Sequence, residues 1–390
     1  MRKALVFYSI FTAAYGLMHL LVFSQAAGAL ALGGPARAGL ALWLAAMTLA
    51  PAALGLAGGR FGVLSRLSFT WMGIVFYLSL GSLVLALCRV SPWPGARPAL
   101  FAAVAAASLA ASVYGLVNAR RLRVRRVTLE TGKLPPGVDA LRLAVVSDLH
   151  LHAAAEGKRL DTVLALLAGL DFDILASLGD LIESGIHREP WREQAAKLAR
   201  VRPRLGKYAV GGNHDLYADI MAGEDVSRRF HEAAGFTLLD GQAVDAGGAI
   251  WLAGVDYPGH GVQTGGGPQR DAAVLRGLPR DRPVALLKHL PTVDPQALGL
   301  FDLQLSGHSH AGQLWPFTYL VRAFFPYVQG LYDLGGGAKL YVSPGTGTWG
   351  PPMRVGSRAE ITLVELRRAR EEKGERGRGG ERMKMRGGTF

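Results

Sequence analysis

The hydrophobic pattern divides the chain into two parts. Before residue 120, the apolar residues form four long runs that contain no Asp, Glu, Lys or Arg. Each run has the roughly twenty residues that a helix needs to cross a bilayer. The sequence therefore predicts a four-helix transmembrane anchor, with spans at 4–23, 38–57, 69–88 and 98–117.

The first run also has an alternative interpretation. Arg2 and Lys3 precede it, and Ser24, Gln25 and Ala26 resemble a cleavage site, so the run could be a signal peptide. Its apolar part is longer than that of a usual signal peptide. We therefore expect a retained span and keep a cleaved leader as the alternative.

After Arg126 the pattern changes to short apolar runs that alternate with amphipathic stretches. We expect helices at 159–170 and 191–201. We expect strands at 141–146, 172–178, 207–210, 250–255, 284–287, 303–305, 340–342 and 360–366. This alternation is typical of βαβ units with parallel strands, and it predicts an α/β fold.

Charge refines the domain boundaries. The net charge is +13, but residues 127–366 carry 22 basic and 26 acidic residues. A nucleic-acid partner is therefore not expected for this region. The arginine-rich segment 120–126 is interpreted as a juxtamembrane linker against anionic lipid, which leaves residues 1–119 as the anchor. Residues 367–390 are charged and glycine-rich, and we expect a disordered basic tail there.

The distribution of basic residues predicts the orientation. If the four spans alternate, nine basic residues lie on the side of the N-terminus and three on the other side. The positive-inside rule then places the N-terminus and everything after residue 120 in the cytoplasm, at the cell inner membrane. The single cysteine, Cys88, lies in the third span, so the soluble part has no disulfide framework and no thiolate metal site.

Candidate chemistry begins where the strand at 141–146 runs directly into Asp148 and His150. Ligands of α/β sheets bind at the carboxyl ends of the strands. Residues i and i+2 of an extended chain point to the same side. Asp148 and His150 can therefore converge on one metal ion.

Four later strands end in the same kinds of residue. Their ends carry Gly179-Asp180-Leu181-Ile182-Glu183, Gly212-Asn213-His214-Asp215, His289, and Gly307-His308-Ser309-His310. Five successive strand ends with metal-ligand side chains indicate a metal centre rather than chance. The ordered set resembles that of the calcineurin-like metallophosphoesterases over residues 127–366. The segments 307–313 and 341–352 further resemble the bacterial membrane-anchored branch of that family.

The resemblance implies an αββα sandwich with two divalent metal ions. Asp148, His150 and His310 would hold the first ion, Asn213, His289 and His308 would hold the second, and Asp180 would bridge them. His214 would contact the phosphate and protonate the leaving oxygen, and Glu183 would orient it, although the family commonly has Asp at that position. The nitrogen and oxygen ligands suit Mn, Fe, Zn, Co or Ni, without choosing among them. Asp215 is expected to support the backbone of its motif.

Two further histidines are candidates for lining the substrate pocket, His152 and His260. The aromatic segment 314–331 has two interpretations. It could cover the sheet as a core segment, or it could lie at the membrane interface and guide an acyl chain toward the metals.

These features predict a membrane-anchored, metal-dependent phosphoesterase. It would hydrolyse a phosphoester or pyrophosphate bond with a metal-bridging hydroxide, with a lipid-linked phosphorylated substrate as the hypothesis. The alternative from another class is a catalytically weak membrane sensor or scaffold with a metal-binding, phosphoesterase-like domain. A nuclease is disfavoured by the net acidic charge of residues 127–366.

Overall fold

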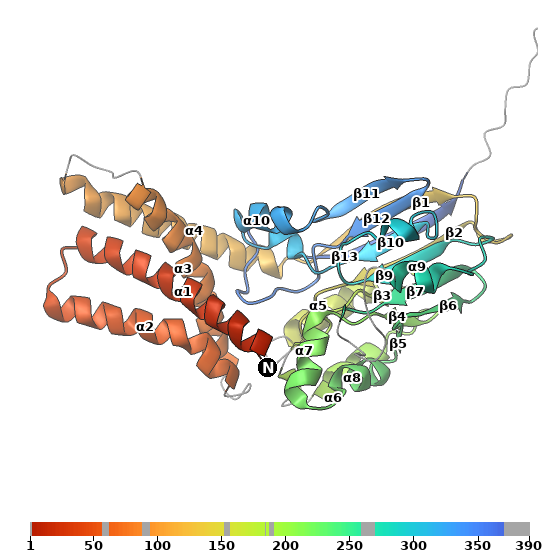
Figure 1. Cartoon of the computed structure of the whole chain (residues 1–390), viewed down its shortest axis with the longest axis horizontal. Helices are drawn as coiled ribbons and strands as arrows, with labels where there is room; N and C mark the ends of the chain where they lie inside the picture. The colour runs from red at the N-terminus through yellow and green to blue at the C-terminus, as the bar shows by residue number, and fades with distance from the viewer. Residues whose placement is uncertain are drawn as a thin grey trace, which may run out of the picture.

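The computed structural model describes residues 2–56, 62–87, 94–151, 157–183, 185–186, 191–258 and 270–369. A bundle of long helices is followed by an α/β domain that contains two sheets (Figure 1). The two parts lie side by side, and the fourth helix leads directly into the domain.

The bundle agrees with the predicted anchor. Its helices are α1 (Arg2–Ala29), α2 (Gly34–Leu56), α3 (Gly62–Leu87) and α4 (Arg97–Arg120). Each contains a segment that is long and apolar enough to span a membrane. Tyr15 and Val22 of α1 are buried together with Val75 of α3. This packing makes α1 an integral member of the bundle and favours a retained span over a cleaved leader.

Among the described residues, each of the two sheets has six strands. The first has the order β1 (Arg123–Thr131), β13 (Glu360–Arg368), β2 (Ala140–Val146), β3 (Ile174–Ser177), β4 (Lys207–Ala209) and β5 (Thr237–Leu238). The second has the order β11 (Gly330–Gly335), β12 (Ala338–Val342), β10 (Leu303–Ser306), β9 (Val284–Lys288), β7 (Ile250–Val255) and β6 (Gln242–Ala246).

The sheets face each other across a common core, with helices outside both. Leu143 and Val145 of β2 pack into the core between the sheets, whereas Ala144 and Val146 face the helices. Burial on both faces explains why this strand is an uninterrupted apolar run. The helices α5 (Gly157–Ala168), α6 (Trp191–Ala199) and α8 (Val226–Ala233) cover the first sheet, and α9 (Arg270–Leu275) covers the second. The predicted αββα sandwich is confirmed.

Parallel pairing brings the motif-bearing strand ends to one edge. In the first sheet β2, β3 and β4 are parallel neighbours, and in the second β9 and β10 are parallel. The carboxyl ends of parallel strands share an edge of their sheet. The two edges meet, because the ring Nδ1 of His289 after β9 lies 2.7 Å from the carbonyl oxygen of Leu178 after β3.

The expectation of a linker at 120–126 is wrong. Helix α4 continues to Arg120 and strand β1 already begins at Arg123. Arg123 is paired in register with Glu360 of β13, and its guanidinium lies 3.0 Å from the carboxylate of that buried residue. Arg123, Arg125 and Arg126 belong to the charged edge strand β1, whose charge discourages pairing with other chains. The anchor therefore enters the sheet without an intervening linker.

Candidate metal centre

The seven predicted ligands gather at the shared edge of the two sheets. All lie directly after strands β2, β3, β4, β9 and β10, and Asn213 also opens helix α7 (Asn213–Ala222). Six are buried, namely Asp148, His150, Asp180, Asn213, His289 and His310, while His308 is half-buried. Burial of so many polar side chains requires that they satisfy one another or a bound ligand.

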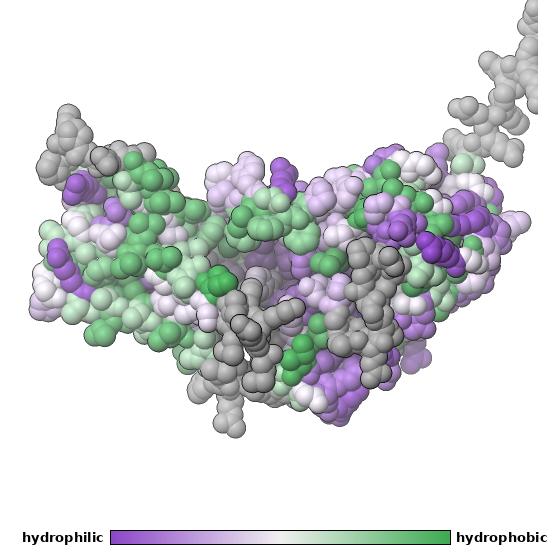
Figure 2. Space-filling model, viewed as in Figure 1, coloured by the Kyte–Doolittle hydropathy of each residue, from purple (hydrophilic) through white to green (hydrophobic). Residues whose placement is uncertain are grey.

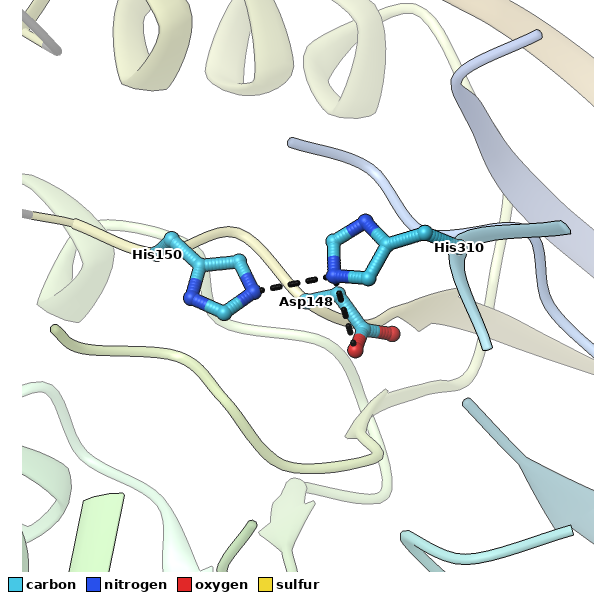
Figure 3. A group of neighbouring side chains, drawn as sticks. All are labelled: Asp148, His150 and His310. Atoms are coloured by element: carbon cyan, nitrogen blue, oxygen red, sulfur yellow. Dashed lines mark hydrogen bonds and ion pairs between the residues drawn. The ribbon is translucent and has the colours of Figure 1, made fainter. Parts of the chain in front are cut away.

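Asp148, His150 and His310 form the first cluster (Figure 3). The Nε2 atom of His310 lies 3.5 Å from Oδ1 of Asp148 and 3.1 Å from Nε2 of His150. One donor atom from each residue lies within 4.8 Å of the others. Nitrogen and oxygen atoms that converge in this way can occupy neighbouring positions around one divalent ion.

Asn213, His289 and His308 form the second cluster. The Oδ1 atom of Asn213 lies 2.9 Å from Nδ1 of His308 and 3.2 Å from Nε2 of His289. The two ring nitrogens are themselves 3.2 Å apart. Three donor atoms therefore converge on one point here as well.

Asp180 lies between the two clusters. Its Oδ2 atom is 3.3 Å from Nε2 of His289 in the second cluster and 3.9 Å from Nε2 of His150 in the first. Its Oδ1 atom accepts a hydrogen bond of 2.7 Å from the backbone N–H of His214. One carboxylate thus reaches both clusters, which is the position of a bridging ligand.

The backbone is strained where it presents these ligands. Asp148, His150 and Asp180 each have a φ of 52°, and His308 and His310 have φ values of 70° and 48°. Left-handed backbone at residues other than glycine costs about 1–3 kcal/mol each and persists only where the surroundings enforce it. Because five predicted ligands carry this strain, the site is built to present its ligands and reduces the stability of the fold in doing so.

Glycine is required in the motifs for a separate reason. A Cβ atom at Gly212 would collide with the Asp180 carboxylate, and one at Gly307 would collide with the Ser147 hydroxyl. The glycines let neighbouring strand ends approach closely enough for the donor atoms to meet.

One carboxylate orients two imidazoles. Oε1 of Glu183 lies 2.7 Å from Nδ1 of His214, and its Oε2 lies 3.0 Å from Nδ1 of His150. In both rings this contact engages Nδ1 and leaves Nε2 for a metal or a substrate. The glutamate is therefore long enough for the orienting position at which the family commonly has Asp, and it serves a cluster residue in addition.

Asp215 occupies the supporting position that was expected. It is fully buried, and its Oδ2 accepts hydrogen bonds of 2.8 Å from the backbone N–H groups of Asp180 and Gly212. Its Oδ1 accepts another of 3.2 Å from Ile182. Asp215 thus ties the second and third motifs together without presenting an oxygen to the clusters.

The electrostatics divide the donors into two groups. Burial raises the pKa of Asp148, and the carboxylates of Asp180 and Asp148 raise that of His289 to about 10 although burial alone would lower it, so a bound cation would have to displace protons from these two residues.

Asp180, His308 and His310 already have the protonation states that suit cation binding. Burial acts to raise the pKa of Asp180, but the nearby rings, His289 first, outweigh it and hold that pKa below its ordinary value. Burial and the neighbouring His289 lower the pKa of His308 to about 3, and burial together with His150 and Arg354 lowers that of His310. An ionised carboxylate and neutral imidazoles are the protonation states that bind metals.

His214 differs from the cluster histidines. Burial alone would lower its pKa, but the carboxylates of Glu183 and Asp180 raise it to about 9. Its ring is therefore protonated at neutral pH and can donate a proton.

Aromatic side chains surround the clusters, and most were not predicted. The ring of His214 lies 5.6 Å from that of Trp349 and 5.5 Å from that of Tyr217. The ring of His308 lies 5.2 Å from Phe325. Tyr217 could have been found, because it follows His214 by three residues on one helix face. The sequence around Trp349 has no comparable signal. His152 and His260 lie outside the described residues.

Comparison with known proteins identifies the family of the chain. Residues 141–312 match the family model described as calcineurin-like phosphoesterase. An uncharacterized metallophosphoesterase of Aquifex aeolicus is 35% identical over 260 residues, which are 65% of this chain and 95% of that protein. A dimetal phosphatase of Danio rerio is a structural match with a TM-score of 0.34 and 13% identity, covering 53% of this chain and 88% of that one.

The chain belongs to the calcineurin-like metallophosphoesterase family, and its α/β domain is that of a metal-dependent phosphoesterase. A zebrafish protein named "Transmembrane protein with metallophosphoesterase domain" is 35% identical over 291 residues, which are 70% of this chain. The chain spans 63% of the length of that relative. Together with the four apolar helices, this similarity makes the chain a membrane-anchored member of the family.

Proposed function

We propose that the protein is a membrane-anchored hydrolase of phosphate esters or anhydrides with two divalent ions in its site. The observation that carries this proposal is the position of Asp180 Oδ2, 3.3 Å and 3.9 Å from ring nitrogens of the two clusters. Asp148, His150 and His310 would hold one ion, and Asn213, His289 and His308 would hold the other. This donor set of nitrogen and oxygen atoms, without thiolate, fits Mn, Fe, Zn, Co or Ni.

The ions, when bound, would polarise the phosphoryl group and lower the pKa of a nearby water. The chain itself supplies the proton for the leaving group. His214 is held by Glu183 through Nδ1, and its raised pKa keeps a proton available on Nε2 for the departing oxygen. Trp349 and Tyr217, which pack against the His214 ring, limit the access of bulk water to it.

We place the catalytic domain on the cytoplasmic face of the inner membrane. The basis is the excess of basic residues on one side of the four spans, nine against three. A green fluorescent protein fused after Phe390 should therefore fluoresce, and an alkaline phosphatase fused there should be inactive. The reverse result for both reporters would show that the domain faces outward.

The substrate proposed here carries its phosphoryl group on a lipid. Helix α10 (Phe317–Phe324) begins seven residues after His310 and has no buried residue. Its surface includes Tyr319, which is 62% exposed, and Phe324, which is 74% exposed. A segment meant to cover the sheet would bury such side chains, so the interfacial interpretation of this segment is the better supported one.

The apolar surface continues in both directions. On one side Leu314 is buried together with Tyr77 of α3, so the segment starts at the anchor. On the other side Phe325 reaches the ring of the cluster residue His308. Figure 2 shows hydrophobic surface over α10 beside that of the anchor. An acyl or prenyl chain could therefore remain in apolar surroundings while its phosphate reached the metals.

We expect the double substitution Tyr319→Ser and Phe324→Ser to separate lipid binding from chemistry. Losing two aromatic contacts of about 1.5–3 kcal/mol each should reduce kcat/KM on hexadecyl 4-nitrophenyl phosphate in phosphatidylcholine vesicles by roughly 100-fold or more. Activity on methyl 4-nitrophenyl phosphate in solution should stay within about twofold, because neither side chain contacts the clusters.

The matched control is Leu298→Ser. Leu298 is 41% exposed and follows a short turn on the second sheet, away from α10. It should leave both activities unchanged. An equal loss on both esters in the α10 variant would assign the helix to the stability of the fold and remove the support for a lipid-linked substrate.

A further inference from the structure

The anchor and the metal centre meet at the loop 343–359, which joins β12 to β13. Met353 in this loop is fully buried and packs against Tyr77 of α3. Met353 packs against a glycine of α3 and a glycine of α4. A Cβ atom added at Gly73 would lie 3.0 Å from Met353 Cε, and one added at Gly115 would lie 3.1 Å from Met353 Cβ. The two glycines form a notch, and any larger residue in it would displace Met353.

Hydrogen bonds hold the backbone of Arg354, the residue after Met353, against helix α4. The backbone N–H of Arg354 donates to the carbonyl oxygen of Gly115 at 3.0 Å. The side chain of Asn118 donates to the carbonyl oxygen of Arg354 at 2.9 Å and to that of Ser357 at 2.8 Å. The Gly115 carbonyl is opposite the N–H of Ala119 within α4, and its second lone pair can accept this additional bond from the loop.

Whereas its backbone is bound to α4, the side chain of Arg354 points toward the metal centre. It is fully buried, and its Nη2 donates to the carbonyl oxygens of Gly347 at 2.7 Å and Pro344 at 2.8 Å. Its Nη1 donates to the carbonyl oxygen of His310 at 3.3 Å. Within the described ranges of the chain, no carboxylate lies at ion-pair distance from this guanidinium, so it acts as a clamp on backbone carbonyls. Loss of such a clamp leaves buried carbonyls unsatisfied.

The clamped loop in turn supports the strained first motif. The backbone N–H of Gly347 donates to the carbonyl oxygen of Asp148 at 3.0 Å, and that of Thr346 donates to Ser147 at 2.7 Å. Asp148 and His310, with φ values of 52° and 48°, both depend on their surroundings to keep the left-handed backbone. Arg354 therefore connects α4 to two of the three residues of the first cluster.

We propose that Arg354 is a positioning residue for the first metal position, and that the seat of Met353 and Arg354 on α3 and α4 sets its geometry. The anchor is then a component of the metal centre, and a shift between α3 and α4 alters the presentation of Asp148 and His310. The second cluster has contacts of its own, including the carbonyl of Leu178, and it meets Asp148 through the backbone N–H of His308, so its affinity should depend less on the seat. This inference rests on the proposed two-metal function.

The test measures Mn²⁺ binding by equilibrium dialysis on the full chain in detergent. The wild-type chain should bind two equivalents. Arg354→Gln and Gly115→Val should each weaken one equivalent by roughly 10–100-fold, which is the usual effect of losing an outer-shell partner of a metal ligand, and should weaken the other much less. Turnover of 4-nitrophenyl phosphate by these two variants should be reduced at low Mn²⁺ concentration and should recover at high Mn²⁺ concentration. A misfolded chain would not recover its activity in this way.

Ala110→Val is the matched control, because Ala110 is on the exposed side of α4. Arg354→Lys should restore part of the affinity, since an ammonium group can still donate to the loop carbonyls. Met353→Ala removes the packing of this loop against α3 and α4 without adding a clash. It should weaken the binding of the same Mn²⁺ equivalent. Unchanged binding of both equivalents in Met353→Ala and Gly115→Val would overturn the coupling. A wild-type chain that binds fewer than two equivalents would instead refute the two-metal function on which the coupling rests.

Discussion

Replacing Asp180 with Asn should reduce turnover by about 10³-fold or more and weaken the binding of both metal ions. The carboxylate oxygen of Asp180 reaches both clusters, so the amide removes one negative charge from two positions at once. Charge stabilisation by a metal site contributes several kcal/mol to the transition state, and each 1.36 kcal/mol corresponds to about tenfold in rate. The measurements are kcat with 4-nitrophenyl phosphate and the Mn²⁺ content of the purified protein.

A matched variant is Asp281→Asn, at a carboxylate whose side chain is 65% exposed and which lies on a loop before β9. It should keep both ions and full turnover. If Asp180→Asn also retained full activity, Asp180 would not be a bridging ligand and the assignment of two metals would have to be abandoned.

Replacing His214 with Ala should also reduce the rate, by about 10²–10⁴-fold, but the protein should retain both metal ions. Its imidazole contacts Glu183, Trp349, Tyr217 and the edge of the His150 ring, so its removal takes away a proton donor and no donor atom of either cluster. The loss should be greatest for an alkyl phosphate, whose leaving oxygen needs a proton, and smaller for 4-nitrophenyl phosphate, whose leaving group departs as an anion.

The same role predicts a change in the pH profile. Glu183 raises the pKa of His214, so the protonated form persists at neutral pH and is lost as the pH rises through about 9. Glu183→Gln removes that charge and should move the alkaline limb of kcat to lower pH. An equal loss on both esters in His214→Ala, with an unshifted alkaline limb in Glu183→Gln, would show that His214 positions the substrate and does not transfer a proton.

The sequence was sufficient to predict most of the candidate site, for a local reason. Each ligand lies within a few residues of the end of an apolar strand, and parallel strands carry their ends to one edge. Asp148 and His150 could therefore be identified from the pattern of a single strand. The αββα layers were expected only through the family resemblance, because periodicity alone does not say that two sheets face each other.

The features that were missed depend on contacts between distant segments. Strand β1 was interpreted as part of a linker, because its arginines read as a juxtamembrane cluster and its partner β13 lies more than 230 residues later. Arg354 is a lone basic residue in the sequence, and its role follows only from the positions of Gly115 and His310. The sequence does not predict helix α10, because Pro316 and Pro326 divide the segment 314–331 into short pieces. In the structure they flank the helix, since Pro316 precedes its first residue and Pro326 follows its C-cap.

The position of β13 has a consequence for how the domain is completed during synthesis. This last strand lies between β1 and β2, parallel to the one and antiparallel to the other. Until the ribosome has released residues 360–368, β1 has no partner strand and β2 has an open edge, although both were made soon after the anchor. Unpaired edges of this kind are sites of aggregation. A nascent chain interrupted before residue 360 would therefore hold an unfinished sheet next to the bilayer, where a chaperone or a membrane protease could recognise it.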